Sequence, residues 1–462
     1  MDCKLRAKNC GGCPMLATEY AAQLKKKEAD VRALLGKYGP VAPIRGMETP
    51  YHYRNKVIST FAPAAGGKLT SGIYAARTHK VLPVESCLLQ DEVLDKVMLA
   101  VRAAANACRY QPFHEDKGTG LLRHCLLRRG VATGQVMVVL VTAQPVLPGA
   151  KNFVKALLAE AEKRGVPVTT VVQNYNPRRT SVVLGEDEKV LYGKGFILDT
   201  LCGKTYALSP RSFYQVNPVQ TAVLYGLAVD AAHLTGKEVV LDAYCGIGTI
   251  GLTASDKARQ VVGVEVNRDA VRDAIGNAKH NGVKNARFFA ADATAWIREA
   301  ADAGQKADVV FMDPPREGST PAFIESVARM APKRVVYVSC NPETMARDLA
   351  LLTQKGYRAE GFTQEKAVSA TRNTVADPGA SEHHTGLAFD ITVAGTIFKG
   401  TEQQIWLHKH CWDYGFIIRY QEDKEDITGF LAECWHIRYV GLPHSTEMRD
   451  RNLCLEEYLG EA

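Results

Sequence analysis

The chain has 462 residues, more than one ordinary domain holds, and 46% of them are hydrophobic and 23% charged, which predicts several folded units with sizeable cores. The net charge of +7 permits a nucleic-acid partner but does not establish one. The N-terminus has no apolar signal segment, and no run reaches the roughly 20 apolar residues of a membrane span. These features exclude a membrane-embedded chain, and we expect a cytoplasmic monomer without a membrane partner.

The first 45 residues hold a group of cysteines and then a helix. Cys10 and Cys13 have C-x2-C spacing, and the two glycines between them allow a tight wrap. Together with Cys3 and Cys87 they are four candidate thiolates, and four thiolates can close a tetrahedral zinc site. Without an export signal, we expect metal ligands, a catalytic thiol and buried thiols among the twelve cysteines rather than disulfides. Residues 19–38 then read as an amphipathic helix.

The rhythm of the sequence changes twice more. Runs of β-forming residues between 46 and 205 are separated by Gly, Pro and Asn turn signals, which predicts a mixed α+β domain. Later, short apolar strands alternate with helical segments, which predicts a doubly wound parallel sheet of the α/β class. We therefore expect four domains, over residues 1–45, 46–205, 206–365 and 366–462.

The first strand of the predicted parallel sheet runs into a glycine-rich loop. In such sheets, ligands bind beyond the carboxyl ends of the strands. Gly246 and Gly248 let the backbone turn tightly and approach a ligand, and Glu265, at the end of the next strand, is placed to bond ribose hydroxyls. A G-x-G-x-x-G loop with an acid about 20 residues later is also the dinucleotide fingerprint. The loop alone therefore leaves a nicotinamide dehydrogenase open.

The fourth and fifth strand ends point to a different chemistry. Asp313 begins a DPPR segment whose prolines stiffen a loop that can press against a flat ring. Cys340 follows the next apolar strand, which places a thiol at the rim of the same crevice. A lone cysteine is more often a small buried hydrophobe. A thiol beside a DPPR loop favours a nucleophile instead, and a dehydrogenase has no use for it.

These segments together resemble one enzyme family. The glycine-rich loop, DPPR, SCNPETMARDL and SFYQVNP are similar to the S-adenosylmethionine-dependent RNA uracil-5 methyltransferases, from Cys3 to about Phe362. The resemblance implies a class I methyltransferase fold with Cys340 as the nucleophile. It also implies that S-adenosylmethionine is held by Gln215, Tyr244, Gly246, Gly248, Glu265, Asp292 and Asp313.

The family's reaction explains the need for a thiol. Carbon 5 of uracil is a poor nucleophile until a thiolate adds to carbon 6. A base must then remove the carbon 5 proton so that the thiol can be eliminated. The target uridine must be unpaired or flipped out to reach the crevice.

The resemblance also extends to the N-terminal cysteines and to the substrate. In this family Cys3, Cys10, Cys13 and Cys87 would hold a [4Fe-4S] cluster, with zinc as the chemical alternative. The cysteines point to ribosomal RNA, of the 23S type, as the partner by family analogy. Phosphate contacts are expected from the middle domain, although the same cations could be ordinary surface charges: Arg54, Lys56, Arg123, Arg128 and Arg129.

The sequence departs from the family after residue 362. Family members carry an H-x-E-T segment whose Glu is the proton-abstracting base and whose strand completes the sheet. No such segment follows the thiol in this chain. We expect a parallel sheet without its last strand and a methyltransferase that turns over poorly.

The last hundred residues show a metal-site pattern instead. His383, Asp390 and His436 could hold a zinc ion with one position open for water, and Glu433 could act as the general base on that water. The segments PGASEHHTGLAFDI and ECWHIRYVG closely resemble the VanY-type zinc D-alanyl-D-alanine carboxypeptidases, whose upstream, substrate-gripping half is missing here. The resemblance implies a partial α+β peptidase domain that acts on peptidoglycan precursor peptides.

The leading hypothesis is thus a methyltransferase that binds S-adenosylmethionine and RNA. The alternative is a zinc D,D-carboxypeptidase that uses the first half as a carrier. A third reading is a binding protein with neither activity, or a chain whose gene was fused or misassembled.

Overall fold

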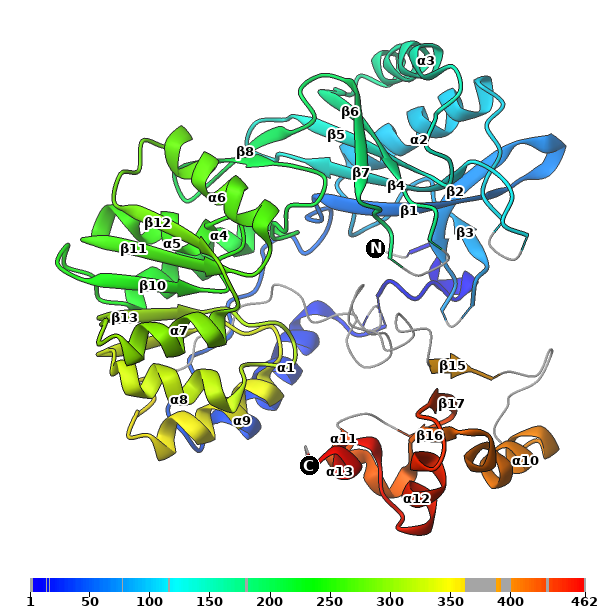
Figure 1. Ribbon diagram of the computed structural model, residues 1–462. Coiled ribbons are helices and arrows are strands. Elements are labelled where there is room, and N and C mark those ends of the chain that lie inside the picture. Colours follow the sequence, from blue (N-terminus) through cyan, green and yellow to red (C-terminus); the bar gives the residue numbers. More distant parts are fainter. Residues whose placement is uncertain are drawn as a thin grey trace. The chain divides into compact units, whose positions relative to one another are not determined.

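The protein is described from a computed structural model (Figure 1). The structure describes residues 3–361 except 14, 16, 77, 115–116 and 179–181, and then residues 388–391, 400–428 and 432–460. The chain divides into two compact units, the first formed by residues 1–178 and 184–371 and the second by residues 179–183 and 372–462. The further division of the first unit into three domains stays a prediction.

The first unit begins with the cysteine-containing turns and helix α1 (Tyr20–Leu35), which confirms the helix expected over residues 19–38. Leu35 and Val41, at and after the end of α1, are buried against the last helix of the parallel-sheet region, α9 (Pro342–Gln354). The N-terminal segment therefore packs onto the element that directly follows Cys340.

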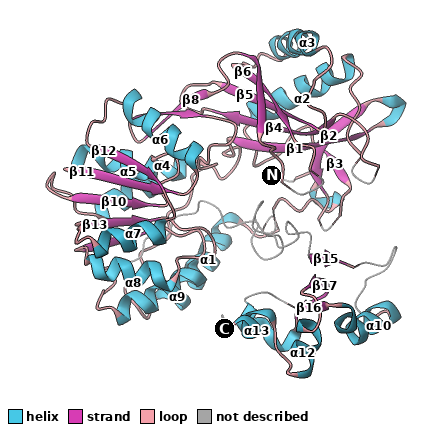
Figure 2. Cartoon of the chain, in the orientation of Figure 1, coloured by secondary structure: helices cyan, strands magenta, loops and turns pink. Residues whose placement is uncertain are grey.

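The middle region is built around a seven-stranded sheet in the order β3-β2-β1-β4-β5-β6-β7. All neighbouring pairs are antiparallel except β5 and β6, which run parallel and are joined through helix α3 (Ala150–Lys163). The strands are β1 (Lys56–Pro63), β2 (Leu69–Tyr74), β3 (Val81–Pro83), β4 (Leu122–Arg129), β5 (Val136–Thr142), β6 (Thr170–Tyr175) and β7 (Asp187–Tyr192). Figure 2 shows helices of this region beside the sheet.

Strands β4 and β5 are buried on both faces, because two cores meet across them. One face packs against helices α2 (Glu92–Ala107) and α3. The other face, through residues such as Leu126 and Val139, packs against the hairpin of β8 (Ile197–Leu201) and β9 (Lys204–Leu208) and against the parallel-sheet region. The nearly continuous apolar run of β5 is the sequence sign of this double burial.

The parallel-sheet region confirms the predicted doubly wound α/β fold. Its five strands are all parallel, in the order β12-β11-β10-β13-β14. Alternate residues of a strand face opposite helix layers: Val240 packs toward the side of α4 and α5, and Leu241 toward the side of α7 and α8. The strands are β10 (Val239–Ala243), β11 (Gln260–Glu265), β12 (Ala286–Ala290), β13 (Val309–Met312) and β14 (Arg334–Tyr337), and the remaining helices are α4 (Pro218–Ala231), α5 (Thr249–Ala254), α6 (Arg268–His280), α7 (Ala293–Asp302) and α8 (Pro321–Met330).

Strand β14 pairs with β13 and, within the described residues, with no further strand. Among the same described residues, no helix is long and apolar enough to cross a membrane.

The second unit is a small α+β fold. Its antiparallel sheet has the order β15-β17-β16, and its core includes Trp412, Ile417 and Ile437. The elements are β15 (Ala388–Asp390), α10 (Glu402–His410), β16 (Phe416–Tyr420), α11 (Glu425–Thr428), β17 (Glu433–Tyr439), α12 (His444–Asp450) and α13 (Leu455–Leu459).

Candidate active site

The glycine-rich loop between β10 and α5 forms the floor of the candidate site. Tyr244, Gly246 and Gly248 all have positive φ angles, of 64°, 54° and 84°, so the chain makes a tight left-handed turn before α5 begins. The backbone N–H of Gly246 donates to Glu265 at 3.1 Å, and the N–H of Gly251 donates to Asp242 at 2.7 Å. Two carboxylates from neighbouring strands therefore hold the loop in shape.

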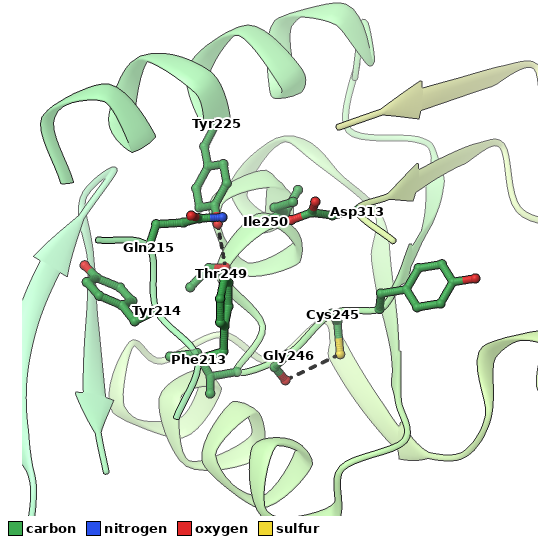
Figure 3. A pocket seen from close by; sticks show the side chains of 11 residues that line it. Phe213, Tyr214, Gln215, Tyr225, Cys245, Gly246, Thr249, Ile250 and Asp313 are labelled. Carbon is green, nitrogen blue, oxygen red and sulfur yellow. Dashed lines mark hydrogen bonds between the residues drawn. The ribbon is translucent and has the colours of Figure 1, made fainter. Parts of the chain in front are cut away.

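A pocket opens above this loop (Figure 3). Gln215 enters it from the segment before α4, and Asp313 from the carboxyl end of β13. Tyr225 lies beside the loop, with its hydroxyl 3.1 Å from that of Thr249, as Figure 3 shows. The lining residues are Phe213, Tyr214, Gln215, Tyr225, Tyr244, Cys245, Gly246, Ile247, Thr249, Ile250 and Asp313.

Two carboxyl groups, the buried Asp242 and the partly buried Asp313, give the site its electrostatic character. Burial raises the pKa of Asp313 to about 7. The pKa of Asp242 is also raised to about 7, first by burial and then by the nearby charges of Asp313 and Glu265. Oδ1 of Asp242 is buried and has no hydrogen-bond partner among the described residues. A cationic ligand in the pocket would favour the ionised form of these carboxyl groups.

Only some of the predicted cofactor residues line the pocket. Gln215, Tyr244, Gly246 and Asp313 line the pocket. Gly248 and Glu265 lie beside it, through the turn into α5 and the hydrogen bond to Gly246. Asp292 caps α7, where its side chain accepts from Ala295 N–H at 2.8 Å. Burial raises the pKa of the Tyr244 phenol, and the charge of Asp292 raises it further by a smaller amount.

Cys340 lies at the carboxyl end of β14, half-buried, between the strand and α9. It is outside the set of residues that line the pocket. The loop that begins with Asp313 is nevertheless tied to its neighbours. The carbonyl of Arg316 accepts from Asn341 Nδ2 at 3.3 Å and from Thr344 Oγ1 at 3.0 Å. The thiol and the DPPR loop therefore occupy the same edge of the sheet.

The four N-terminal candidate thiolates come from two segments of the chain. Burial and then the charges of Cys87, Cys10 and Cys3 raise the pKa of Cys13 to about 12. Burial also raises the pKa of Cys87, and the backbone N–H groups of Leu89 and Gln90 lower it by a smaller amount. Within the described residues, no group of three or more His, Cys, Asp or Glu already has the geometry of a metal site. Thiolates are ligands of iron-sulfur clusters and of zinc, so the identity of the residues does not distinguish the two.

The expected phosphate contacts in the middle domain are wrong for two buried arginines. Arg128 is 1% exposed and donates to the carbonyls of Ser209 and Ser212 at 3.1 and 2.7 Å. Arg123 is buried and donates to the carbonyl of Asn176 at 2.9 Å. These two guanidinium groups stabilise the fold, because they satisfy backbone carbonyls. Arg129 is partly exposed and pairs with Asp91 at 2.6 Å, and a phosphate contact there stays a prediction.

The other two expected contacts are half-buried. Lys56 stands opposite Arg128 across β1 and β4, and burial together with Arg128 and Arg54 lowers its pKa to about 8. Arg54 lies near the cysteines, since its charge lowers the pKa of Cys13.

The peptidase-like residues are described only in part. His383 lies outside the described residues. Asp390 of β15 stands directly opposite His436 of β17 in the antiparallel register. Nδ1 of His436 is 3.0 Å from a carboxylate oxygen of Glu433, the residue expected to act as the base. Two predicted zinc ligands are thus brought into register, and a zinc centre stays a prediction.

Several residues at the site were missed by reasoning from sequence patterns. Phe213 and Tyr225 line the pocket, and Asp242 braces the glycine loop. Phe213 stands two residues before Gln215 in SFYQVNP, so the motif itself was a usable signal. Asp348, in MARDL, is fully buried and contacts the DPPR loop.

Comparison with known proteins places two families on the chain. Residues 182–363 match the family model for tRNA (uracil-5-)-methyltransferase, and residues 346–442 match the model for the VanY D-alanyl-D-alanine carboxypeptidase.

Curated relatives and a solved structure extend the first match. An uncharacterized RNA methyltransferase of Halalkalibacterium halodurans is 42% identical over 76% of this chain and 77% of its own length. One from Clostridium tetani is 41% identical over 76% of each. The crystal structure of the Pyrococcus abyssi tRNA (uracil-54, C5)-methyltransferase with S-adenosyl-L-homocysteine is 25% identical, has a TM-score of 0.64, and is matched over 79% of this chain and 84% of that one.

Proposed function

We propose a function that follows from the family of the chain. The chain belongs to the S-adenosylmethionine-dependent RNA (uracil-5-)-methyltransferases. The chain transfers a methyl group to carbon 5 of a uridine in 23S ribosomal RNA, through a covalent adduct on Cys340. The observation that supports this is the link between the two halves of the site. The loop that puts Asp313 into the pocket wall is hydrogen-bonded, at Arg316, to Asn341 next to the thiol.

Each residue has a chemical task in this proposal. S-adenosylmethionine supplies an electrophilic methyl group on a sulfonium sulfur. Glu265 accepts hydrogen bonds from ribose hydroxyls, and the carboxylate of Asp313 offsets positive charge in the pocket. The Cys340 thiolate forms a bond to carbon 6 of the uracil, and the electron pair of the broken 5,6 double bond gives carbon 5 its nucleophilic character. Carbon 5 then takes the methyl group as the bond from the methyl carbon to the sulfonium sulfur breaks, which leaves S-adenosylhomocysteine as a neutral thioether. The carbon 5 proton must leave before the thiolate is expelled.

The sequence lacks the H-x-E-T segment whose Glu would remove the carbon 5 proton in this last step. The match to the methyltransferase model ends at residue 363, and the following residues carry the VanY pattern in place of an H-x-E-T segment. We therefore expect the methylated adduct to form and to decay slowly.

The test is incubation with ribosomal RNA and, separately, transfer RNA in the presence of labelled S-adenosylmethionine. The expected result is a protein–RNA complex that survives denaturation, carries the label, forms with ribosomal RNA and is lost in Cys340→Ala. Rapid release of 5-methyluridine would overturn the slow-decay step. Neither adduct nor labelled RNA would overturn the proposed reaction, and an adduct with transfer RNA alone would overturn the assigned target.

A [4Fe-4S] cluster on Cys3, Cys10, Cys13 and Cys87 is part of the same proposal. Its support is the C-x2-C pair of Cys10 and Cys13 together with Cys3 and Cys87, whose charges both act on the Cys13 thiol. Anaerobically purified protein should contain iron and acid-labile sulfide in equal amounts. Stoichiometric zinc without iron would instead support the closed tetrahedral alternative.

A second candidate function is zinc-dependent D-alanyl-D-alanine carboxypeptidase activity on peptidoglycan peptides. It is favoured by the VanY match and by the register that sets Asp390 opposite His436. His383, Asp390 and His436 would be the ligands and Glu433 the base. Zinc-loaded full-length protein should release D-alanine from a pentapeptide, with Glu433→Gln as the inactive control. Zinc-loaded protein that releases no D-alanine would rule the activity out.

A further inference from the structure

Asp348 is a buried carboxylate between α9 and the loop that begins with Asp313. It is 0% exposed and lies in the second turn of α9. One carboxylate oxygen accepts from the hydroxyl of Tyr337 at 2.6 Å and from the N–H of Ser319 at 2.7 Å. The other oxygen accepts from Nε and Nη2 of Arg347 at 3.0 and 2.8 Å. Four donors thus converge on one buried carboxylate, which is the arrangement that makes burying a charge tolerable.

The donors come from the elements that carry the two halves of the site. Tyr337 is the last residue of β14, three residues before Cys340. Ser319 closes the loop that starts at Asp313 and leads into α8. Arg347 is on α9, the helix that begins just after the thiol. A carboxylate that bonds all three fixes their relative positions.

Further hydrogen bonds extend this arrangement along the loop. Nη2 of Arg347 also donates to the carbonyls of Glu317 and Ser319, at 2.7 and 3.1 Å. The hydroxyl of Ser319 is 3.5 Å from that of Tyr244, a pocket residue of the glycine-rich loop. Contacts therefore run from Asp348 through Ser319 to the cofactor pocket on one side, and through Tyr337 toward the thiol on the other.

We propose that Asp348 is a positioning residue for methyl transfer, which fixes the loop from Asp313 to Ser319 against α9 and so aligns the pocket with the Cys340 thiol. The inference rests on the proposed function, because it assigns Asp348 a role in bringing the two reacting sites into line. Reactions of oriented partners are sensitive to such alignment, and a misplacement of about 1 Å can lower a rate on the order of 100-fold. The glycine loop is held by direct hydrogen bonds to Asp242 and Glu265, and its link to Asp348 is only the 3.5 Å contact between Tyr244 and Ser319. Loss of the Asp348 carboxylate should therefore slow the reaction more than it weakens cofactor binding.

The test variant is Asp348→Asn, which keeps the size of the side chain but turns an NH2 group toward one of the donors. Asp302→Asn is the matched control, because Asp302 is an exposed carboxylate on α7 that pairs with Arg329. Tyr337→Phe is a milder second variant that removes one donor and leaves the carboxylate in place. Adduct formation on ribosomal RNA, the Kd for S-adenosylmethionine, the thermal midpoint and hydrogen exchange of residues 316–319 are measured for each.

The expected result is an adduct rate lower by about 10- to 100-fold in Asp348→Asn, with the Kd within about threefold and faster exchange confined to residues 316–319. Tyr337→Phe should change the same quantities in the same direction by less, and Asp302→Asn should change none. An adduct rate within about twofold of the native rate would overturn the proposal, as would a loss of rate matched by equal loss of folded protein or of cofactor binding.

A native protein that forms no adduct would mark failure of the proposed function instead. Exchange of residues 316–319 and alkylation of Cys340 by iodoacetamide then decide the positional claim. Unchanged exchange and alkylation in Asp348→Asn overturn it, and a change in both supports it.

Discussion

The backbone N–H of Gly246 donates a hydrogen bond to the carboxylate of Glu265 across 3.1 Å. The second oxygen of the same carboxylate accepts from the N–H of Asn267 at 2.8 Å. Glu265 is therefore held at the carboxyl end of β11 by two backbone groups, one on each side of it. This fixes both the acid expected to meet a ribose and the loop expected to pass beneath the cofactor.

Replacing Glu265 by Gln should weaken S-adenosylmethionine binding about tenfold. A hydrogen bond to a charged group contributes roughly 1.5–3 kcal/mol, and the amide also turns an NH2 group toward a backbone donor. Isothermal titration calorimetry gives the Kd. Glu238→Gln is the matched control, because Glu238 precedes β10 at the opposite edge of the same sheet and its carboxylate bonds Thr235. Equal affinities for the Glu265 variant and the native protein would contradict the assignment.

Cofactor affinity should depend on pH through Asp313. Burial raises the pKa of this carboxyl to about 7, so it is mostly neutral below pH 7 and ionised above it. A sulfonium cation binds better beside the ionised form, and affinity should therefore rise as the pH increases from 6 to 8. Asp242, which holds the glycine-rich loop beneath the pocket, titrates in the same range.

Binding measured in a pH series with native protein and Asp313→Asn separates the two carboxyl groups. The variant should bind more weakly at pH 8 and should show a flatter profile. The pH dependence of affinity that remains in Asp313→Asn is the contribution of Asp242. An unchanged profile in the variant would show that Asp313 does not govern the pH dependence.

Sequence patterns were most informative where a local pattern is enough to determine the geometry. Strands that alternate with helices place their carboxyl ends at one edge, so the order of elements alone could assign Gly246, Glu265, Asp313 and Cys340 to one edge of the sheet. The basic run in LRHCLLRRG is the opposite case. Arg128 looks like a surface cation, yet two cores close over both faces of β4, and that burial depends on chain segments far away in the sequence.

Arg128 should therefore matter for stability rather than for RNA binding. Arg128→Met leaves the buried carbonyl of Ser212 and the partly buried carbonyl of Ser209 without their donor. The expected loss is about 1–3 kcal/mol of unfolding free energy, mainly from the unsatisfied buried carbonyl. Urea denaturation measures it, with Lys155→Met, an exposed residue of α3, as the control. The salt dependence of RNA binding should stay the same in this variant. A weaker salt dependence would indicate that Arg128 contacts a phosphate.

Two glycines offer a matched test of the packing beneath the pocket. A Cβ on Gly251 would lie 2.8 Å from the Asp242 carboxylate and 2.9 Å from a methyl carbon of Val261, whereas a Cβ on Gly276 of α6 meets nothing within 4 Å. Gly251→Ala should lose about 1–3 kcal/mol of stability through overpacking. Gly276→Ala should gain roughly 0.5–1 kcal/mol, because alanine is the better helix former. Thermal unfolding of both variants checks this, and equal effects would contradict the close contact.

The loop of Cys87 should depend on Asp95. Asp95 is 7% exposed, and its carboxylate accepts from the N–H of Cys87 at 2.8 Å. This bond holds the backbone of Cys87 against the first turns of α2. Asp95→Ala should therefore lower the iron content and speed iron release to a chelator several-fold, as changes to the partners of metal ligands typically do by about 10-fold or more.

Asp91→Asn is the matched control for Asp95→Ala, because Asp91 caps the same helix and pairs with Arg129 but does not bond the Cys87 turn. Asparagine caps a helix as well as aspartate does, so this variant should keep its iron. Iron and sulfide analysis with the visible absorbance of the cluster provides the readout, together with the thermal midpoint of each variant. If both variants lose iron equally, the start of α2 as a whole supports the cysteines. If only Asp95→Ala does, the support comes from the single hydrogen bond to Cys87.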